Sequence, residues 1–213
     1  MKVTLIPVTH FQQNCSLLVC EETGRAVVVD PGGEVERIEG EIARQQARPE
    51  RILITHGHVD HCAGAQALAA RYDIPIEGPQ QDDRFLLDAL PEQCERFGLP
   101  ACDAFVPQRW LGEGDQVSFG REQLEVLHCP GHTPGHVVFF SRAQRLALVG
   151  DVLFAGSIGR TDFPRGDHAA LLRSIREKLW ALGDEVTFIA GHGPVSTFGE
   201  ERRTNPYVAD GVA

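Results

Sequence analysis

The sequence predicts a four-layer αββα sandwich, in which two β-sheets pack together and helices cover their outer faces. Short apolar runs alternate with helical patterns along nearly the whole chain, and strands come in runs, then a helix, then strands again, in two similar halves. This order differs from the regular βαβα alternation of a doubly wound sheet. The 213 residues contain no repeat, low-complexity tract or linker, so we expect one domain spanning 1–213.

In the first half, apolar runs separated by turn residues predict strands at 3–8, 16–20, 26–29, 51–54 and, briefly, 75–77. An amphipathic charged stretch and an alanine-rich stretch predict helices at 35–46 and 63–72. Residues 79–107 carry four prolines and mixed polarity, which indicates a short helical or loop excursion. No role is assigned to that segment.

In the second half, the same patterns predict strands at 116–119, 124–128, 136–141, 145–149 and 186–190. A helix is expected at 168–182, with Asp167 as its N-cap. The second half therefore repeats the arrangement of strands and outer helix that the first half shows.

Charge and cysteine content exclude several classes of protein. With 20 basic and 30 acidic residues, the net charge of −10 leaves no basic surface to spare for nucleic acid or anionic membrane. The first residues lack the apolar run of a signal peptide, and no stretch approaches a membrane span. Six cysteines without a Cys-x-x-Cys pair predict free thiols. We therefore expect a cytoplasmic protein.

The strongest chemical signal is the heptad Thr55-His56-Gly57-His58-Val59-Asp60-His61, which follows a predicted strand. Four potential ligands in six residues do not share one helix face. In a loop, His56 and His58 can share one direction while Asp60 and His61 reach a second point. Imidazole and carboxylate together suit zinc, iron or manganese.

Three further candidate ligands also follow apolar strands. They are His132, Asp151 and His192, and glycine precedes each of them. Ligands in α/β sheets gather at the carboxyl edge of the strands, and glycine permits close backbone approach at Gly150 and Gly191. Together the chain offers seven ligands for two divalent metals, with zinc expected and iron or manganese as alternatives. His136 is expected to order its turn or support a ligand rather than bind metal.

This set of motifs, in this order, resembles the metallo-β-lactamase superfamily. Within it, the Gly131–His136 segment, Gly-His-Thr-Pro-Gly-His, and the compact length are most similar to short type II glyoxalase-like hydrolases, relatives of the hydroxyacylglutathione hydrolases. The resemblance implies that Asp30 supports the ligand loop and that Asp151 bridges the metals. It further implies one metal held by His56, His58 and His132, and another held by Asp60, His61 and His192.

The ligand set suits hydrolysis of a small-molecule thioester, and the resemblance implies a substrate such as S-D-lactoylglutathione. A metal lowers the pKa of bound water from about 15.7 to about 7, so metal-bound hydroxide, supported by Asp60 and Asp151, would attack the acyl carbonyl. A thiolate leaves without strong acid assistance. No Gly-x-Ser-x-Gly element offers a serine nucleophile instead.

The chain departs from full-length type II glyoxalases in two places. About twenty residues follow His192, where those enzymes carry a helical region that helps to bind glutathione. The Gly-Arg-Thr-Asp-Phe segment at 159–163 is instead similar to persulfide dioxygenases. We therefore expect loose recognition of the thiol carrier. Arg160 would anchor a substrate carboxylate or, alternatively, brace its own loop through Asp162 or Asp167.

Other functions remain as alternatives. A persulfide dioxygenase would use a single iron on the same ligands and consume oxygen. A β-lactamase would normally carry an export signal, and a nuclease of the superfamily would need a basic face. A non-catalytic zinc module is the alternative outside enzymes, but structural zinc sites are closed and usually rich in cysteine.

Overall fold

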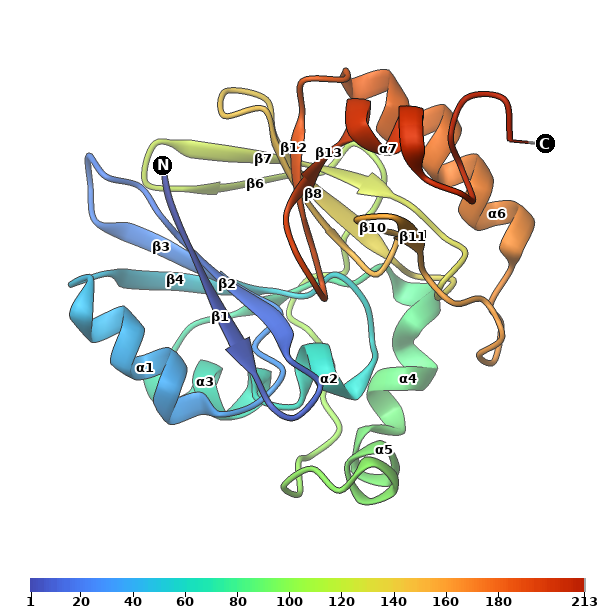
Figure 1. Ribbon diagram of the computed structural model, residues 1–213. Coiled ribbons are helices and arrows are strands. Elements are labelled where there is room, and N and C mark those ends of the chain that lie inside the picture. Colours follow the sequence, from blue (N-terminus) through green and yellow to red (C-terminus); the bar gives the residue numbers. More distant parts are fainter. Residues whose placement is uncertain (213) are drawn as a thin grey trace.

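Two β-sheets form the centre of the molecule, which we describe from a computed structural model over residues 1–212 (Figure 1). The first sheet has five strands in the order β1-β2-β3-β4-β5. Its β3–β4 and β4–β5 pairs are parallel, and the others are antiparallel. The strands are β1 Lys2–Val8, β2 Gln13–Val19, β3 Arg25–Val29, β4 Arg48–Leu53 and β5 Ile76–Glu77.

The second sheet has six strands in the order β13-β12-β9-β8-β7-β6, and only its β9–β12 pair is parallel. A separate ribbon pairs β10 with β11. The strands of the sheet are β6 Gln116–Phe119, β7 Glu122–His128, β8 Val137–Ser141, β9 Leu146–Gly150, β12 Thr187–Ala190 and β13 Ser196–Thr197. The ribbon consists of β10 Leu153–Phe154 and β11 Ser157–Ile158.

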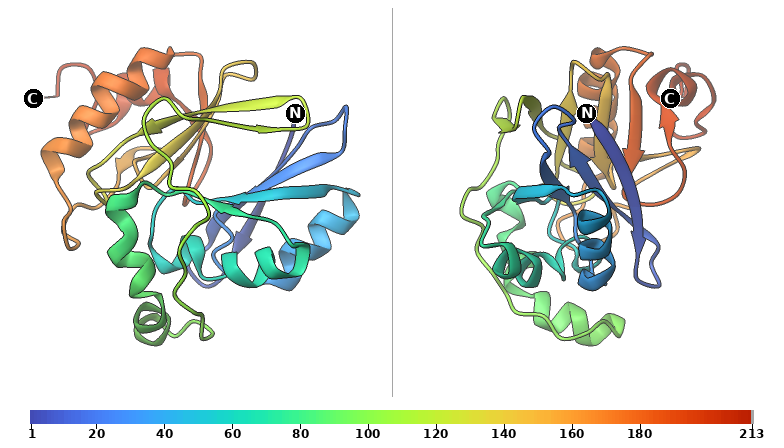
Figure 2. Two further views of the ribbon diagram at one scale, coloured as in Figure 1. Left: turned by 180° about the vertical axis from the view of Figure 1, so that it is seen from behind. Right: turned by 90° about the vertical axis from the view of Figure 1, so that its left-hand side faces the viewer.

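Helices cover the outer face of each sheet (Figure 2). Those beside the first sheet are α1 Val35–Arg44, α2 Val59–Cys62, α3 Ala65–Tyr72, α4 Arg84–Asp88 and α5 Leu90–Phe97, with a 3₁₀ turn at Gln81–Asp83. Those beside the second are α6 His168–Arg173 and α7 Phe198–Thr204. The predicted helix at 168–182 begins as α6 and continues through a π-helical turn, Ser174–Leu179, and a 3₁₀ turn, Trp180–Leu182. Asp167 caps it by accepting a hydrogen bond from the Ala170 amide at 2.9 Å.

Three layers of buried apolar side chains hold the four layers of secondary structure together. Between the sheets, Leu18 and Leu53 of the first meet Phe119 and Phe139 of the second. The outer face of the first sheet packs on the apolar stripes of its helices, and the outer face of the second does the same. Removing these faces from water drives the stacking. The predicted αββα sandwich is confirmed.

The predicted strands and helices are present, with boundary shifts of up to three residues, but the sequence analysis missed α2, β10, β11, β13 and α7. The excursion at 79–107 contains the 3₁₀ turn, α4 and α5, followed by a loop. All six cysteines are unpaired thiols, as predicted. Within residues 1–212, no helix combines the length and apolar character needed to cross a membrane.

Candidate metal centre

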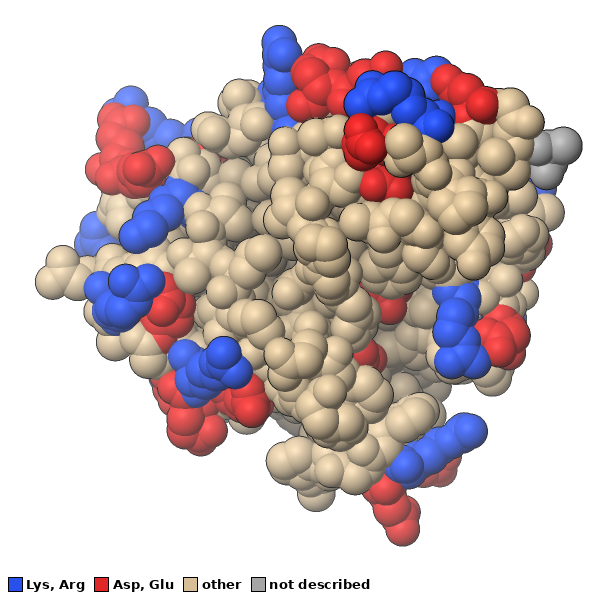
Figure 3. All heavy atoms as spheres, in the orientation of Figure 1, with Lys and Arg blue, Asp and Glu red and all other residues tan. Residues whose placement is uncertain are grey.

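The seven predicted ligands come together where strands of both sheets end. His56 and His58 follow β4, His132 follows β7, Asp151 comes directly after β9, and His192 lies two residues after β12. Asp60 and His61 complete the set from α2. The front face is hollowed between the two halves of the molecule, and acidic side chains lie in that hollow (Figure 3).

The histidine-rich heptad is not wholly a loop, which corrects the sequence prediction. His56 lies in the loop after β4, and His58 is the N-cap residue of α2 with an extended backbone, whereas Asp60 and His61 belong to that short helix. The apolar residues Val59 and Cys62 lie three apart and are both buried, and this spacing favours a helical turn. The turn separates the first two ligand candidates from the second two.

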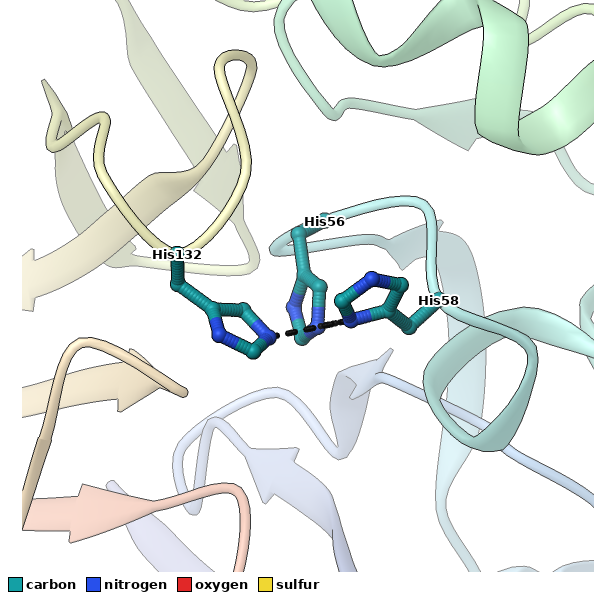
Figure 4. A group of neighbouring side chains, drawn as sticks. All are labelled: His56, His58 and His132. Atoms are coloured by element: carbon teal, nitrogen blue, oxygen red, sulfur yellow. Dashed lines mark hydrogen bonds between the residues drawn. The ribbon is translucent and has the colours of Figure 1, made fainter. Parts of the chain in front are cut away.

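Three histidine nitrogens face one another in the first group of ligand atoms. His58 Nδ1 lies 3.1 Å from His56 Nε2 and 2.9 Å from His132 Nε2. Figure 4 shows the three rings pointing toward a shared point, two from the heptad and one from the turn after β7. All three nitrogens lie within 4.8 Å of one another, a spacing that could hold a metal ion.

Hydrogen bonds on the far side of two of these rings direct their lone pairs inward. His132 Nδ1 donates to the Arg160 carbonyl at 2.8 Å, because a carbonyl oxygen only accepts. His56 Nδ1 lies 3.0 Å from Thr55 Oγ1, whose own proton goes to Asp30. Nε2 of each ring is therefore free to bind a cation.

A second group contains Asp60, His61 and His192. Asp60 Oδ2 lies 3.2 Å from His192 Nε2 and 3.8 Å from His61 Nε2. The outer nitrogens are again engaged, His61 Nδ1 with Asp30 Oδ2 at 2.9 Å and His192 Nδ1 with the Phe11 carbonyl at 3.1 Å. The ligand-type atoms of this group also lie within 4.8 Å of one another.

Asp151 lies between the two groups. Its Oδ1 is 3.3 Å from His61 Nε2, and its Oδ2 is 3.6 Å from His132 Nε2 and 3.7 Å from His192 Nε2. Asp151 Oδ1 and His61 Nε2 are both buried without a hydrogen-bond partner. Orphaned buried polar atoms are costly, and cations held between these groups would satisfy them. The residues therefore fit divalent metal ions.

In the first group and at Asp151, the protonation states favour metal binding at neutral pH. Burial lowers the pKa of His56 well below its usual value and that of His58 to about 3, so these rings are neutral. Burial alone would raise the pKa of Asp151, but His61 and the neighbouring histidines hold it below its usual value. Neutral imidazoles and an ionised carboxylate are the forms that bind divalent ions. Burial alone would lower the pKa of His61, but Asp151 and Asp60 raise it well above its usual value, so this ring releases a proton when it binds a cation.

Residues around the ligand candidates fix their positions. Asp30 is buried and accepts from the Thr55 amide at 2.7 Å and the Thr55 hydroxyl at 2.6 Å, which fits the supporting role implied by the resemblance. His136 accepts a hydrogen bond from the Asp151 amide at 3.0 Å and stacks on His56 at 4.7 Å. It thus supports ligand candidates, as the sequence suggested.

Arg160 braces its own loop. Its guanidinium is exposed and makes a forked ion pair with Asp162, with contacts of 3.0 and 2.8 Å. It also stacks at 4.6 Å over Phe163, whose ring packs against His58 at 4.9 Å. The structure therefore shows the bracing arrangement that the sequence left as the alternative to substrate binding.

Sequence reasoning missed the supporting contacts that come from the main chain and from Phe163. The carbonyls of Phe11 and Arg160 orient His192 and His132, but every residue has a carbonyl, so the sequence carries no signal for them. Phe163 belongs to a segment noted only for its family resemblance. The remaining histidines, His10, His128 and His168, lie outside both groups.

Comparisons with known proteins find relatives along nearly the whole chain. The sequence profile of the metallo-beta-lactamase superfamily matches residues 8–192. A hydroxyacylglutathione hydrolase, GloC, from Haemophilus influenzae is 48% identical over 209 residues, which cover 98% of each chain. The mitochondrial persulfide dioxygenase ETHE1 of Mus musculus is 32% identical over 195 residues, covering 89% of this chain and 69% of the mouse protein.

Two solved structures share nearly the whole fold. The B3 metallo-beta-lactamase BLEG-1 superposes with a TM-score of 0.90 at 34% identity, covering 98% of this chain and all of that one. The protein TTHA1623, in a di-iron-bound form, superposes with a TM-score of 0.87 at 35% identity, covering 96% of this chain and all of that one.

Proposed function

Because the chain belongs to the metallo-β-lactamase superfamily, we propose that it is a dinuclear-metal hydrolase that cleaves small-molecule thioesters of the S-D-lactoylglutathione type. The superfamily binds divalent metals, and the chain is a homologue of a glyoxalase II-type hydrolase. The observation that carries the proposal is the position of Asp151 between two groups of ligand-type atoms. One carboxylate in contact with both groups is suited to a pair of ions.

The seven ligand candidates form one set for each ion, with Asp151 common to both sets. His56, His58 and His132 would hold one ion, Asp60, His61 and His192 the other, and Asp151 would contact both. When bound, divalent ions supply Lewis acidity and activate water at neutral pH. Zinc is the metal we propose, with iron or manganese as alternatives, since imidazole and carboxylate suit all three. The solved di-iron form of TTHA1623 keeps iron in consideration.

A thioester fits this centre because the chemistry then needs little help from protein acids. The leaving thiolate is stable at neutral pH, and within residues 1–212 neither group of ligand-type atoms includes a cysteine. Cys62 is buried and directs its thiol to the His58 carbonyl at 3.0 Å. The hydrolase from Haemophilus influenzae matches along 98% of both chains, which supports a glutathione thioester as the substrate. The unpaired cysteines also agree with a reducing cytoplasm as its location.

We expect the metal-loaded protein to hydrolyse S-D-lactoylglutathione without consuming oxygen. The assay would follow loss of the thioester and release of glutathione under air and under nitrogen, with an oxygen electrode in parallel. Equal rates in both atmospheres support hydrolysis, and removal of metal by a chelator should abolish them.

The persulfide dioxygenase is the second candidate, favoured by the mouse relative and by the Gly-Arg-Thr-Asp-Phe segment. Glutathione persulfide is therefore the second substrate in the same assay. Stoichiometric oxygen uptake with the persulfide, while thioesters remain intact, would replace the hydrolase proposal with the dioxygenase.

We expect Arg160→Ala to change kcat/KM for lactoylglutathione by less than about threefold, about 0.7 kcal/mol. The guanidinium is exposed and already paired with Asp162, so it offers a substrate carboxylate little net gain. Wild type and variant would be compared on lactoylglutathione and on a short lactoyl thioester without the peptide. Asp162→Ala is the matched control, because it frees Arg160 without removing it.

Loose recognition of the carrier predicts similar kcat/KM for the two thioesters. A preference of about a hundredfold for the glutathione ester would mean about 2.7 kcal/mol of specific recognition. If Arg160→Ala erased that preference, Arg160 would be the substrate anchor and the bracing interpretation would be wrong.

A further inference from the structure

A buried carboxylate in the 3₁₀ turn before α4 links the two loops that carry the first group of ligand candidates. Asp83 has no exposed surface. Its Oδ2 accepts from the Gly57 amide at 2.9 Å, and Gly57 lies between His56 and His58. The segment 79–107, to which no role was assigned from the sequence, thus reaches the centre of the ligand loop.

The same carboxylate also reaches the turn that carries His132. Its Oδ2 accepts from the Thr133 hydroxyl at 2.7 Å, and its Oδ1 accepts from the Gly135 amide at 2.6 Å. These partners lie 26, 50 and 52 residues from Asp83 in sequence. One side chain therefore bonds the heptad to the turn after β7, and no ligand candidate takes part in the bonds themselves.

The three hydrogen bonds require both oxygens of the buried Asp83 carboxylate to act as acceptors. Burial raises the pKa of Asp83 to about 6, and the hydrogen bonds from Thr133, Gly57 and Gly135 oppose that rise. Hydrogen bonds to a charged acceptor are the stronger kind, so the link is stiff when the carboxylate is ionised. An asparagine in this place would turn its amide N–H toward at least one N–H donor and break one arm of the link.

We infer that Asp83 is a positioning residue. It fixes the two loops that carry His56, His58 and His132 relative to each other, so that these three side chains can bind one metal ion. The inference rests on the proposed dinuclear centre. It assigns Asp83 to one of the two ions only, because the Asp60, His61 and His192 group is oriented instead by Asp30 and the Phe11 carbonyl. Loss of the link should therefore weaken one site and spare the other.

The test is metal stoichiometry and affinity for Asp83→Asn, measured by elemental analysis and by competition with a chromogenic chelator. We expect one ion per chain to bind about 10- to 100-fold more weakly, the range typical when a group that orients a ligand is removed. The other ion should keep its wild-type affinity. Under a chelator of intermediate strength, the variant should then retain one ion where wild type retains two.

Double variants show which ion is lost. Combined with His192→Ala, Asp83→Asn should leave no tightly bound ion, because each change then affects a different site. Combined with His132→Ala, it should still leave one, because both changes affect the same site. Loss of both ions in Asp83→Asn alone would contradict the inference.

Two controls separate positioning from loss of stability. Glu201 is another buried carboxylate with three donors, Gly156, Ser196 and Asn205, and it touches neither ligand loop. Glu201→Gln should lower the melting temperature without selective loss of one ion. Asp82→Asn changes an exposed neighbour of Asp83 and should change neither property.

If Asp83→Asn does not fold, Thr133→Val removes one of the three donors and should weaken the same ion by up to about tenfold. Wild-type affinity for both ions in Asp83→Asn or, failing that, in Thr133→Val would overturn the inference while leaving the dinuclear proposal intact. A wild-type protein that binds fewer than two ions would instead refute the dinuclear proposal.

Discussion

Replacing Asp151 with alanine should remove both metal ions and lower hydrolase activity by about a thousandfold, about 4 kcal/mol. Asp151 is the carboxylate that lies within 3.3 to 3.7 Å of His61, His132 and His192. Without it, each group of ligand atoms loses its shared anion and keeps only its own three members. Elemental analysis and the thioester assay would measure the two effects on the same preparation.

A matched control distinguishes the loss of the shared ligand from a general effect of removing an acid. Asp88, at the end of α4, is exposed and pairs only weakly with Arg84 at 3.5 Å. Asp88→Ala should retain both ions and wild-type activity. The metal-free forms of both variants should give the same circular dichroism spectrum as metal-free wild type.

Metal analysis of wild type and of three variants can contradict the proposal of two bound ions. If wild type holds a single tightly bound iron, and if His61→Ala and His192→Ala leave that iron and the activity in place, then the second group of ligand candidates has no metal role. Retention of two ions in Asp151→Ala would also be incompatible with the shared carboxylate.

Replacing Gly191 with alanine should lower activity by about a hundredfold, about 2.7 kcal/mol, although no polar group is removed. A Cβ at this position would lie 2.1 Å from Asp151 Oδ1 and 2.5 Å from His61 Cε1, far inside van der Waals contact. The backbone has little room to retreat, because Gly191 bonds to the Gly150 carbonyl at 2.8 Å and to the Asn14 amide at 2.7 Å. The two ligand candidates must therefore move instead.

The effect of Gly191→Ala should be on metal affinity more than on folding. Gly191 does not have a positive φ, so alanine there creates a steric clash rather than backbone strain. Metal titration should show weaker binding, and the melting temperature of the metal-free form should fall by only a few degrees. Gly40→Ala, in α1 with no atom within 4 Å of the added Cβ, is the control and should bind metal normally. Activity of Gly191→Ala within about twofold of wild type would show that the close approach is not needed.

The sequence by itself determined the layers of the fold and the identity of the ligand candidates. Alternating apolar residues mark β6 and β7, and the helical spacing of Ile38 and Ile42 marks α1, because these patterns are local and follow directly from the periods of strand and helix. The ligand candidates were visible because His and Asp follow apolar runs beside glycine. Their order along the chain then carried the family resemblance.

Only the tertiary structure decided which of these residues meet and what holds them there. His58 and His132 are 74 residues apart, and nothing in either local sequence places their nitrogens 2.9 Å from each other. The same is true of Asp83. Nothing in the sequence around this residue predicts that its carboxylate accepts hydrogen bonds from Gly57 and Thr133. The Phe11 carbonyl behind His192 also has no signal in the local sequence. These features depend on long-range packing, in which the buried faces of the two sheets bring distant loops to one edge and hydrogen bonds between those loops set the final geometry.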